Sequence, residues 1–262
     1  MEWTEGWAIE EEGGLSRARV LDSGACPHCN GTGRRAFTLD GVSRVGRCRC
    51  QRLPDRAKTY NEAAIPARHA ACTMENFRAE LARPTWAAVR GWLDGYRPGG
   101  DMQGLVIFGP PGRGKTHLMA AVIRELVFRH GVPTRFVEFT HLLAAIREGF
   151  EHNHSEARLV APLVRVPVLA IDELGKGRGT DWEKDVLDQL ITRRYNAHPG
   201  PILATSNFPP RAPRARRDND SLSTGTVATL PEVLGERVWS RLAESVKFVE
   251  AGGDDYRITR GR

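Results

Sequence analysis

The chain has 262 residues, 40% of them hydrophobic, which suits one domain with an appendage or two small domains. No apolar run approaches the roughly 18 residues of a membrane span, and the acidic opening "MEWTEGWAIEEEGG" lacks the pattern of a secretory signal, so we expect a cytoplasmic protein without membrane contacts. The formal net charge of +6 favours an anionic partner, nucleic acid first.

Residues 1–58 show little helical or strand periodicity and hold four of the five cysteines. "CPHCNGTG" and "GRCRCQR" supply two close pairs, so that four thiolates can surround one Zn²⁺ tetrahedrally. A segment this short buries too little apolar area to fold unaided, and a metal ion supplies the missing stabilisation. We therefore predict a zinc module with the ligands Cys26, Cys29, Cys48 and Cys50. Two alternatives stay open: His28 in place of one cysteine, and a redox role for the C-x-x-C pair.

Residues 59–103 are predicted to form a helical linker. "TWAAVRGWLDGY" (Thr85–Tyr96) is helix-like, and "RPGGDMQG" ends the pattern. The fifth cysteine, Cys72, is expected to be a small buried apolar residue.

From residue 104 to residue 262, apolar strands alternate with helical patterns. The predicted strands are continuously apolar, as in a parallel sheet covered on both faces: Leu105–Phe108, Thr134–Phe139, Val166–Ile171 and Pro201–Thr205. The predicted helices follow the first three strands: Thr116–Arg129, His141–Phe150 and Trp182–Ala197. This alternation predicts an α/β domain with a mainly parallel sheet between helices.

The stretch between the first strand and the first helix fits the phosphate-loop pattern G-x-x-x-x-G-K-[ST]. Its glycines let successive backbone N–H groups point at phosphate oxygens, and the helix N-terminus adds partial positive charge. Lys115 should bridge the outer phosphates of ATP, and Thr116 should ligate Mg²⁺. The predicted nucleotide-binding residues are Gly109, Pro110, Pro111, Gly112, Arg113, Gly114, Lys115, Thr116 and His117.

Two adjacent carboxylates follow the third predicted strand, Val166–Ile171, in "VLAIDELG". Asp172 is expected to hold Mg²⁺, and Glu173 beside it to polarise an attacking water. "ATSN" ends the fourth strand and puts Asn207 where its amide can orient that water. With Lys115, these residues predict a site that hydrolyses ATP to ADP and phosphate.

The ordered set "GPPGRGKT", "IDEL", "TSN" and "LGERVWSRL" resembles the AAA+ ATPases of the bacterial helicase-loader group, which includes the DnaC and DnaI loaders and the IstB transposition helper. The resemblance covers roughly residues 60 to 260 and implies an AAA+ P-loop domain. It implies that Arg241 is an arginine finger for a neighbouring subunit's ATP, supported by Arg237, so that hydrolysis requires self-association. It also makes Arg257 of "YR" a second nucleotide sensor that binds ATP.

The same resemblance implies a helicase loader that binds a replicative DNA helicase and single-stranded DNA, with a zinc module that attaches to the partner or to DNA. By the same resemblance, the predicted helix His141–Phe150 falls where such proteins carry a helical element facing DNA, so that Arg147 is a candidate DNA contact or a plain surface arginine. Residues 208–226, rich in proline and arginine, are predicted to be a loop insertion that is either solvated or in contact with DNA.

Other functions fit the sequence less well. A transposition helper of the IstB kind, which binds duplex DNA and recruits a transposase, is the alternative. The presence of Glu173 argues against an adaptor that binds ATP without hydrolysing it, and the sequence has no sign of the acceptor site or lid of a small-molecule kinase.

Overall fold

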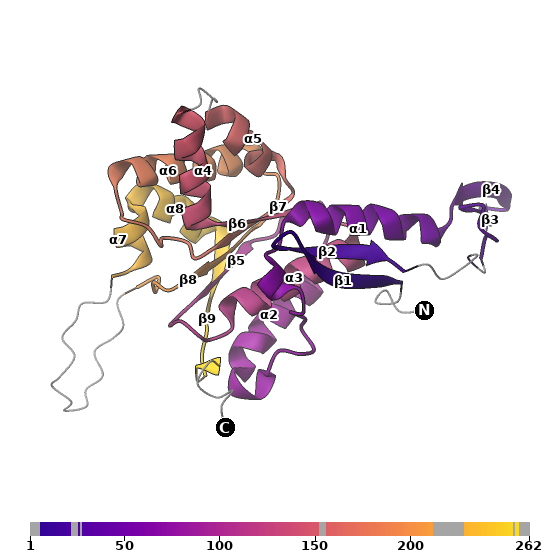
Figure 1. Cartoon of the computed structure of the whole chain (residues 1–262), viewed down its shortest axis with the longest axis horizontal. Coiled ribbons are helices and arrows are strands. Elements are labelled where there is room, and N and C mark those ends of the chain that lie inside the picture. The colour runs from indigo at the N-terminus through magenta and orange to yellow at the C-terminus, as the bar shows by residue number, and fades with distance from the viewer. Residues whose placement is uncertain are drawn as a thin grey trace.

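A five-stranded parallel sheet forms the centre of the molecule (Figure 1). The computed structural model describes residues 6–21, 26, 28–151, 156–211, 228–253 and 255–256. The strands lie in the order β6-β7-β8-β5-β9 and all pair in parallel. Their bounds are β5 Gly104–Phe108, β6 Thr134–Glu138, β7 Val168–Asp172, β8 Ile202–Ser206 and β9 Val246–Glu250. Because the strands are parallel, their carboxyl ends meet at one edge of the sheet, where ligands bind in open α/β folds.

Helices cover both faces of this sheet, as the continuously apolar strands require. In β5, Leu105 and Ile107 enter one hydrophobic core while Val106 enters the other. The first core is covered by α1 Arg52–Ala63, α2 Arg83–Gly95 and α3 Lys115–His130. The second is covered by α4 Phe139–Glu151, α5 Glu156–Arg165, α6 Asp181–Ala197, α7 Leu230–Leu234 and α8 Glu236–Ser245.

The four predicted strands and three predicted helices of this domain are confirmed to within a few residues at their ends. A fifth strand, β9, was not predicted, because "VKFVE" is short and alternates as an edge strand does. Helix α5 was not predicted either; it carries Pro162 in its interior, which breaks the expected helical pattern. The remaining short turns of 3₁₀ helix are Arg49–Gln51, Ala67–His69 and Ala79–Leu81.

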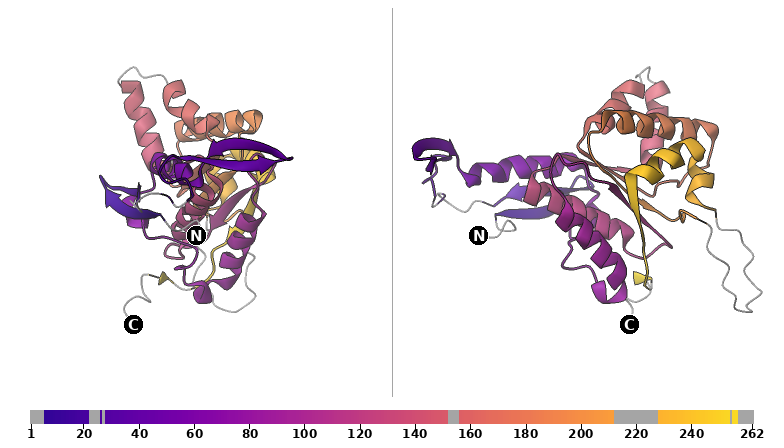
Figure 2. Two further views of the ribbon diagram at one scale, coloured as in Figure 1. Left: turned by 90° about the vertical axis from the view of Figure 1, so that its right-hand side faces the viewer. Right: turned by 180° about the vertical axis from the view of Figure 1, so that it is seen from behind.

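The N-terminal segment contains regular structure that the sequence did not indicate. It has two antiparallel hairpins, with strands β1 Trp7–Glu12, β2 Leu15–Val20, β3 Arg34–Leu39 and β4 Val42–Arg47. Apart from the buried Ser16 and Ala18 of β2, the residues of these strands are half-exposed or exposed, so the strands lack the continuous apolar runs that marked the central sheet. The views agree that the β3–β4 hairpin projects from the end of α1, away from the sheet (Figure 2).

Helix α1 contacts both strand β2 of the β1–β2 hairpin and helix α3. Asn61 accepts from the Ala18 N–H at 2.6 Å and donates to the Ala18 carbonyl at 3.0 Å. The Tyr60 ring stacks on Phe128 of α3, with 4.9 Å between ring centroids. The predicted boundary at residue 58 falls inside α1, which connects the cysteine-bearing segment to the phosphate-loop helix. The predicted domain boundaries at residues 58 and 103 stay predictions.

Among the described residues, no helix has the length and apolar character needed to cross a lipid bilayer.

Candidate ATP site and metal cluster

The predicted phosphate loop lies between the carboxyl end of β5 and the start of α3. Two of its glycines have left-handed backbone and close neighbours, so a side chain at either position would be strained. At Gly112 (φ +77°), a Cβ atom would lie 2.1 Å from a carboxylate oxygen of Asp255. At Gly114 (φ +72°), it would lie 2.7 Å from the Phe77 ring. Glycine at these two positions therefore lets the loop follow its path without backbone strain.

Lys115 is held on the inner side of that loop. It is buried, and its Nζ donates to the carbonyl oxygens of Gly109 and Pro110, both at 2.7 Å. It begins α3, where the helix N-terminus adds partial positive charge. The predicted phosphate cradle thus concentrates a side-chain cation and a helix end in one place.

Asp172 ends β7 and joins the phosphate-loop helix to the neighbouring strand. Its Oδ1 accepts hydrogen bonds from the hydroxyls of Thr116, at 2.9 Å, and Thr205, at 2.5 Å. Its Oδ2 is buried and has no hydrogen-bond partner among the described residues. Burial raises the pKa of Asp172, and the two threonine hydroxyls lower it in part. An ionised carboxylate is costly here, and a divalent cation beside Oδ2 and Thr116 would offset that cost.

Glu173 follows directly, in a left-handed conformation that is uncommon for a residue with a side chain (φ +55°). Its N–H donates to Thr205 Oγ1 at 3.0 Å, so the same hydroxyl that binds Asp172 also holds the Glu173 backbone. Its carboxylate oxygen Oε2 lies 2.5 Å from Lys176 Nζ, and this hydrogen bond raises the pKa of Lys176. The two adjacent carboxylates therefore have different partners, two threonine hydroxyls for Asp172 and the Lys176 ammonium group for Glu173.

Asn207 follows β8 at the same edge of the sheet and is half-buried. The residue before it fixes the local geometry, since the Ser206 hydroxyl donates to the Leu174 carbonyl at 2.8 Å and accepts from the Phe208 N–H at 3.1 Å. The Ser206 carbonyl accepts from the Gly109 N–H at 3.0 Å. The structure thus brings together the phosphate loop and the ends of β7 and β8, where Lys115 and the two acids lie.

The two candidate finger arginines lie elsewhere, on α8. Arg241 is partly exposed; its Nη1 lies 3.5 Å from Asp188 of α6 and donates to the Arg237 carbonyl at 3.1 Å. Arg237 itself is exposed. Arg257 lies outside the described residues, as do residues 212–226 of the predicted insertion. The candidate DNA contact Arg147 stacks over the Trp182 ring, 4.7 Å from its centroid.

Several contacts at this site were not predicted. The Tyr256 N–H donates to the Gly112 carbonyl at 2.9 Å, so the C-terminal segment crosses the phosphate loop. The predicted nucleotide-binding residue His117 contacts the linker: its Nε2 lies 3.0 Å from the Thr73 carbonyl, and its ring lies against Phe77. No local pattern marks these contacts, because they join segments far apart in the chain.

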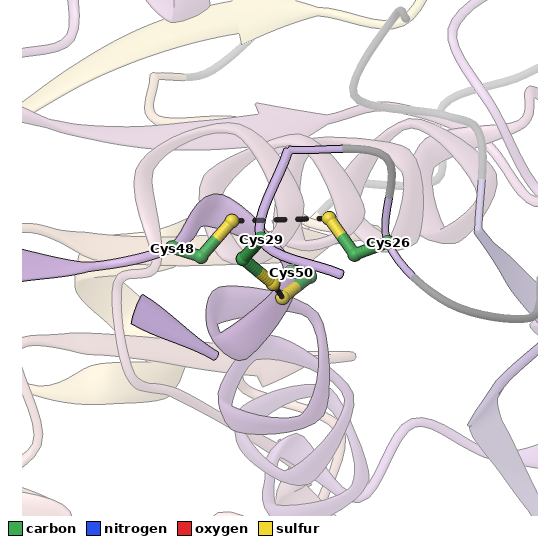
Figure 3. Close-up of side chains that lie close together, drawn as sticks. All are labelled: Cys26, Cys29, Cys48 and Cys50. Carbon is green, nitrogen blue, oxygen red and sulfur yellow. Dashed lines mark hydrogen bonds between the residues drawn. The ribbon is translucent and has the colours of Figure 1, made fainter. Parts of the chain in front are cut away.

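The four predicted zinc ligands gather at one point near the β3–β4 hairpin (Figure 3). The Sγ atoms lie within 4.8 Å of one another, with 3.8 Å between Cys26 and Cys48 and 3.6 Å between Cys29 and Cys50. Zinc–sulfur bonds of about 2.3 Å place tetrahedral sulfurs about 3.8 Å apart, so the cluster fits a zinc ion. His28 is not part of it. Cys72, with its half-buried side chain, lies apart in the linker; burial raises its pKa to about 11.

This arrangement defines a class of protein. A parallel sheet with a glycine-rich phosphate loop after one central strand, and an acid buried at the end of a strand in the same sheet, is the frame of a P-loop ATPase of the AAA+ type. The chain belongs to the family of IstB-like ATP binding proteins, whose model matches residues 99–260. The predicted AAA+ fold and ATPase activity are confirmed at this level.

Known proteins with a similar sequence or structure include a helicase loader, DnaC, and the protein DnaI. The replicative helicase loader DnaC of Escherichia coli (strain K12) is 27% identical over 188 residues, which cover 71% of this chain and 68% of that protein. The crystal structure of the DnaC helicase loader matches with a TM-score of 0.56 at 22% identity, over 70% of this chain and 98% of that one. The crystal structure of DnaI matches with a TM-score of 0.54 at 22% identity, over 74% of this chain and 94% of that one.

Proposed function

We propose that this protein is an ATP-dependent helicase loader, in which ATP held between subunits controls the delivery of a replicative helicase to single-stranded DNA. The observation that carries the ATPase part is the buried Asp172 carboxylate, which two threonine hydroxyls hold through one oxygen while the other oxygen has no partner among the described residues. The sequence similarity to DnaC supports the client. The cytoplasm is the compartment in which such a protein would work.

In this proposal the phosphate loop binds ATP through its backbone N–H groups, and Lys115 turns its ammonium group from the loop carbonyls to the outer phosphates. Thr116 Oγ1 and Asp172 Oδ2 would hold Mg²⁺, which neutralises phosphate charge. Asp172 is held ready for this because Thr116 and Thr205 fix its Oδ1. His117 and Arg113 would border the nucleotide.

Hydrolysis then depends on Glu173. A water oxygen attacks the γ-phosphorus, the bond to the β–γ bridging oxygen breaks, and ADP leaves with that oxygen. The water proton passes to the Glu173 carboxylate, while the Asn207 amide orients the water. Arg241 of an adjoining subunit, supported by Arg237, would stabilise the charge that develops on the transferred phosphoryl group.

The cysteine cluster has a separate role in this proposal. Zn²⁺ held by four thiolates would stabilise the fold of the short N-terminal segment. This segment lies outside the residues that match the family model. Because the β3–β4 hairpin projects beside the cluster, this module is suited to attach the ATPase to its client (Figure 2).

The decisive experiment uses the purified replicative helicase of the host and the purified full-length protein. Size-exclusion chromatography should give a complex of the two that changes with a slowly hydrolysed ATP analogue, and single-stranded oligonucleotide binding should follow the same nucleotide dependence. A well-folded protein that binds ATP but forms no complex with the helicase would refute the loader function.

Three variants test the site itself. Lys115→Ala should abolish ATP binding, whereas Glu173→Gln should bind ATP and hydrolyse it at least about 10²-fold more slowly. Arg241→Ala should bind ATP normally and lose turnover in the assembled protein. A fully active wild-type monomer would contradict the role of Arg241, and wild-type turnover in Glu173→Gln would contradict its role as the base.

A transposition helper that binds duplex DNA is the second candidate, favoured by the family model that matches residues 99–260. A complex with a transposase and a preference for duplex over single-stranded oligonucleotides would support it over the loader.

A further inference from the structure

The β3–β4 hairpin is exposed on both of its faces. Every residue of its two strands is exposed except Gly46, which is half-buried, and none of them belongs to either hydrophobic core. In the described part of the chain, four of the five large hydrophobic side chains that are exposed lie on this hairpin: Phe37, Leu39, Val42 and Val45. Exposed apolar side chains gathered in one place are typical of a surface that binds a partner.

The geometry of the hairpin is fixed at both ends. At its tip, Asp40 and Gly41 have φ of +53° and +77°, as in the two-residue turn that matches the twist of the strands. At its base, the Cys48 N–H donates to the Gly33 carbonyl at 2.8 Å, and the Gly33 N–H donates to Cys29 Sγ at 3.3 Å. Because a free two-stranded hairpin is only marginally stable in water, the turn and the cysteine cluster together hold its side chains in one register.

One face of the hairpin combines an aromatic ring with two guanidinium groups. Opposed residues of antiparallel strands share a face, and the register sets Phe37 opposite Arg44 and Arg35 opposite Gly46. Arg35 and Phe37 are two positions apart on β3, so they lie on this same face. The Phe37 ring lies across Gly46, where a Cβ atom would be 2.9 Å from the ring, and it remains 45% exposed.

The charge of the hairpin indicates the kind of partner. Between residues 34 and 47 the chain has four arginines and a single acid, Asp40. Arg47 lies 3.2 Å from Asp55 of α1, whereas neither Arg35 nor Arg44 has an ion-pair partner among the residues that the structure describes. Exposed guanidinium groups on either side of an open ring are complementary to a polyanion that also carries flat rings.

We propose that the face formed by Arg35, Phe37 and Arg44 binds single-stranded nucleic acid, with a base stacked on the Phe37 ring and phosphates bound to the two arginines. A single strand fits because its bases can turn a free π-face to the ring, whereas the bases of a duplex are already stacked and paired. The inference deepens the proposed function, because it gives the strand a contact outside the residues that match the family model. Binding at this face does not require ATP.

Stacking and phosphate binding make separate contributions that can be measured. Loss of the ring should weaken the binding of a short oligothymidylate about 5- to 150-fold, as in other single-strand sites. Loss of one phosphate-binding arginine should lower the slope of log affinity against log salt concentration by about 0.7. A change in this slope is not expected from a purely structural effect.

The first test measures the affinity of the zinc-loaded full-length protein for a fluorescent oligothymidylate by anisotropy, without ATP and at several salt concentrations. Phe37→Leu keeps an apolar side chain but removes the ring, and should weaken binding at least about 5-fold with an unchanged salt slope. Arg35→Gln and Arg44→Gln should each weaken binding and lower the slope. The matched controls lie on the opposite face, where Arg34→Gln and Val45→Ala should stay within about 2-fold of the wild type. Wild-type affinity in Phe37→Leu and in both arginine variants, with unchanged zinc content, would overturn the inference.

The second test locates the base directly. An oligothymidylate that carries one 5-iodouracil is irradiated on the protein, and mass spectrometry of the tryptic digest should find an adduct on residues 36–44, the peptide that holds Phe37. Adducts found only on other peptides would overturn the inference.

The failure of this inference can be told from the failure of the proposed function. The three variants of the ring face (Arg35, Phe37 and Arg44) should still form the complex with the replicative helicase. A lost helicase complex with unchanged oligothymidylate binding would make the face a protein-docking surface and overturn the inference alone. A wild-type protein that forms no helicase complex would instead refute the loader function.

Discussion

Thr205→Val should separate the role of one hydroxyl from the shape of its side chain. The Thr205 hydroxyl donates to Asp172 Oδ1 at 2.5 Å and accepts from the Glu173 N–H at 3.0 Å. Valine has nearly the same shape but can make neither hydrogen bond. The variant therefore removes one of the two donors that hold the buried Asp172 carboxylate and the one side-chain acceptor that holds the strained Glu173 backbone.

The size of the expected loss of activity follows from the hydrogen bond between the Thr205 hydroxyl and the charged Asp172 carboxylate. A hydrogen bond to a charged group contributes about 1.5–3 kcal/mol, and each 1.36 kcal/mol is a factor of ten in rate. If the loss falls on the transition state, kcat/KM for ATP should drop about 10- to 150-fold in Thr205→Val. Thr205→Ser keeps the hydroxyl and should stay within about 3-fold of the wild type.

The assay is steady-state ATP hydrolysis over a range of ATP and Mg²⁺ concentrations, with the melting temperature as a check on folding. The Mg²⁺ concentration for half-maximal activity should rise in Thr205→Val, because Asp172 becomes harder to ionise and less well oriented. A folded Thr205→Val protein with turnover within twofold of the wild type would refute the view that this hydroxyl positions the two acids.

Three further predictions concern the metal, the core and pH. Elemental analysis of the purified protein should find about one zinc ion per chain. The Cys26→Ser variant should lack this ion and the Cys72→Ser variant should keep it. A metal-free protein with a folded N-terminal segment would contradict the role of the cysteine cluster as a zinc site. The buried Arg194 donates to the carbonyl oxygens of Leu163, Val164 and Val166, at the end of α5, and of Gly200. Arg194→Met should therefore lower the free energy of unfolding by about 3–5 kcal/mol, whereas Met in place of the exposed Arg193 should change it by less than about 0.5 kcal/mol. Equal denaturation midpoints for the two variants would exclude this role of Arg194. Because burial raises the folded-state pKa of Asp172 above its ordinary value of 3.8, its protonated form stabilises the Mg²⁺-free protein at low pH, and that stability is lost as pH rises through the raised pKa. Denaturation of wild type and Asp172→Asn at several pH values should show this loss only in the wild type.

Much of the site was predictable because its signals are local. The phosphate loop is a contiguous stretch whose glycines are fixed by backbone geometry, and the pair Asp172 and Glu173 directly follows an apolar strand. Parallel strands place their carboxyl ends at one edge, so the order of motifs along the chain was enough to expect them together. The four cysteines were recognisable because tetrahedral thiolate ligation needs only two close pairs. The roles of the individual site residues, Asn207, Arg237 and Arg241 included, stay predictions.

The amino-acid sequence by itself determined the alternation of strands and helices, the phosphate loop and the metal-binding spacing, because each depends on neighbouring residues and on side-chain periodicity. Only the tertiary structure decided which distant groups meet. The strand order sets β8 beside β7, so Thr205 reaches Asp172 although the two residues are 33 positions apart in the chain. Likewise Tyr256 reaches Gly112, and the turn at Glu173 brings Lys176 back onto the base. Such contacts carry no periodic signal, since they arise from how the strands pair and where the chain turns.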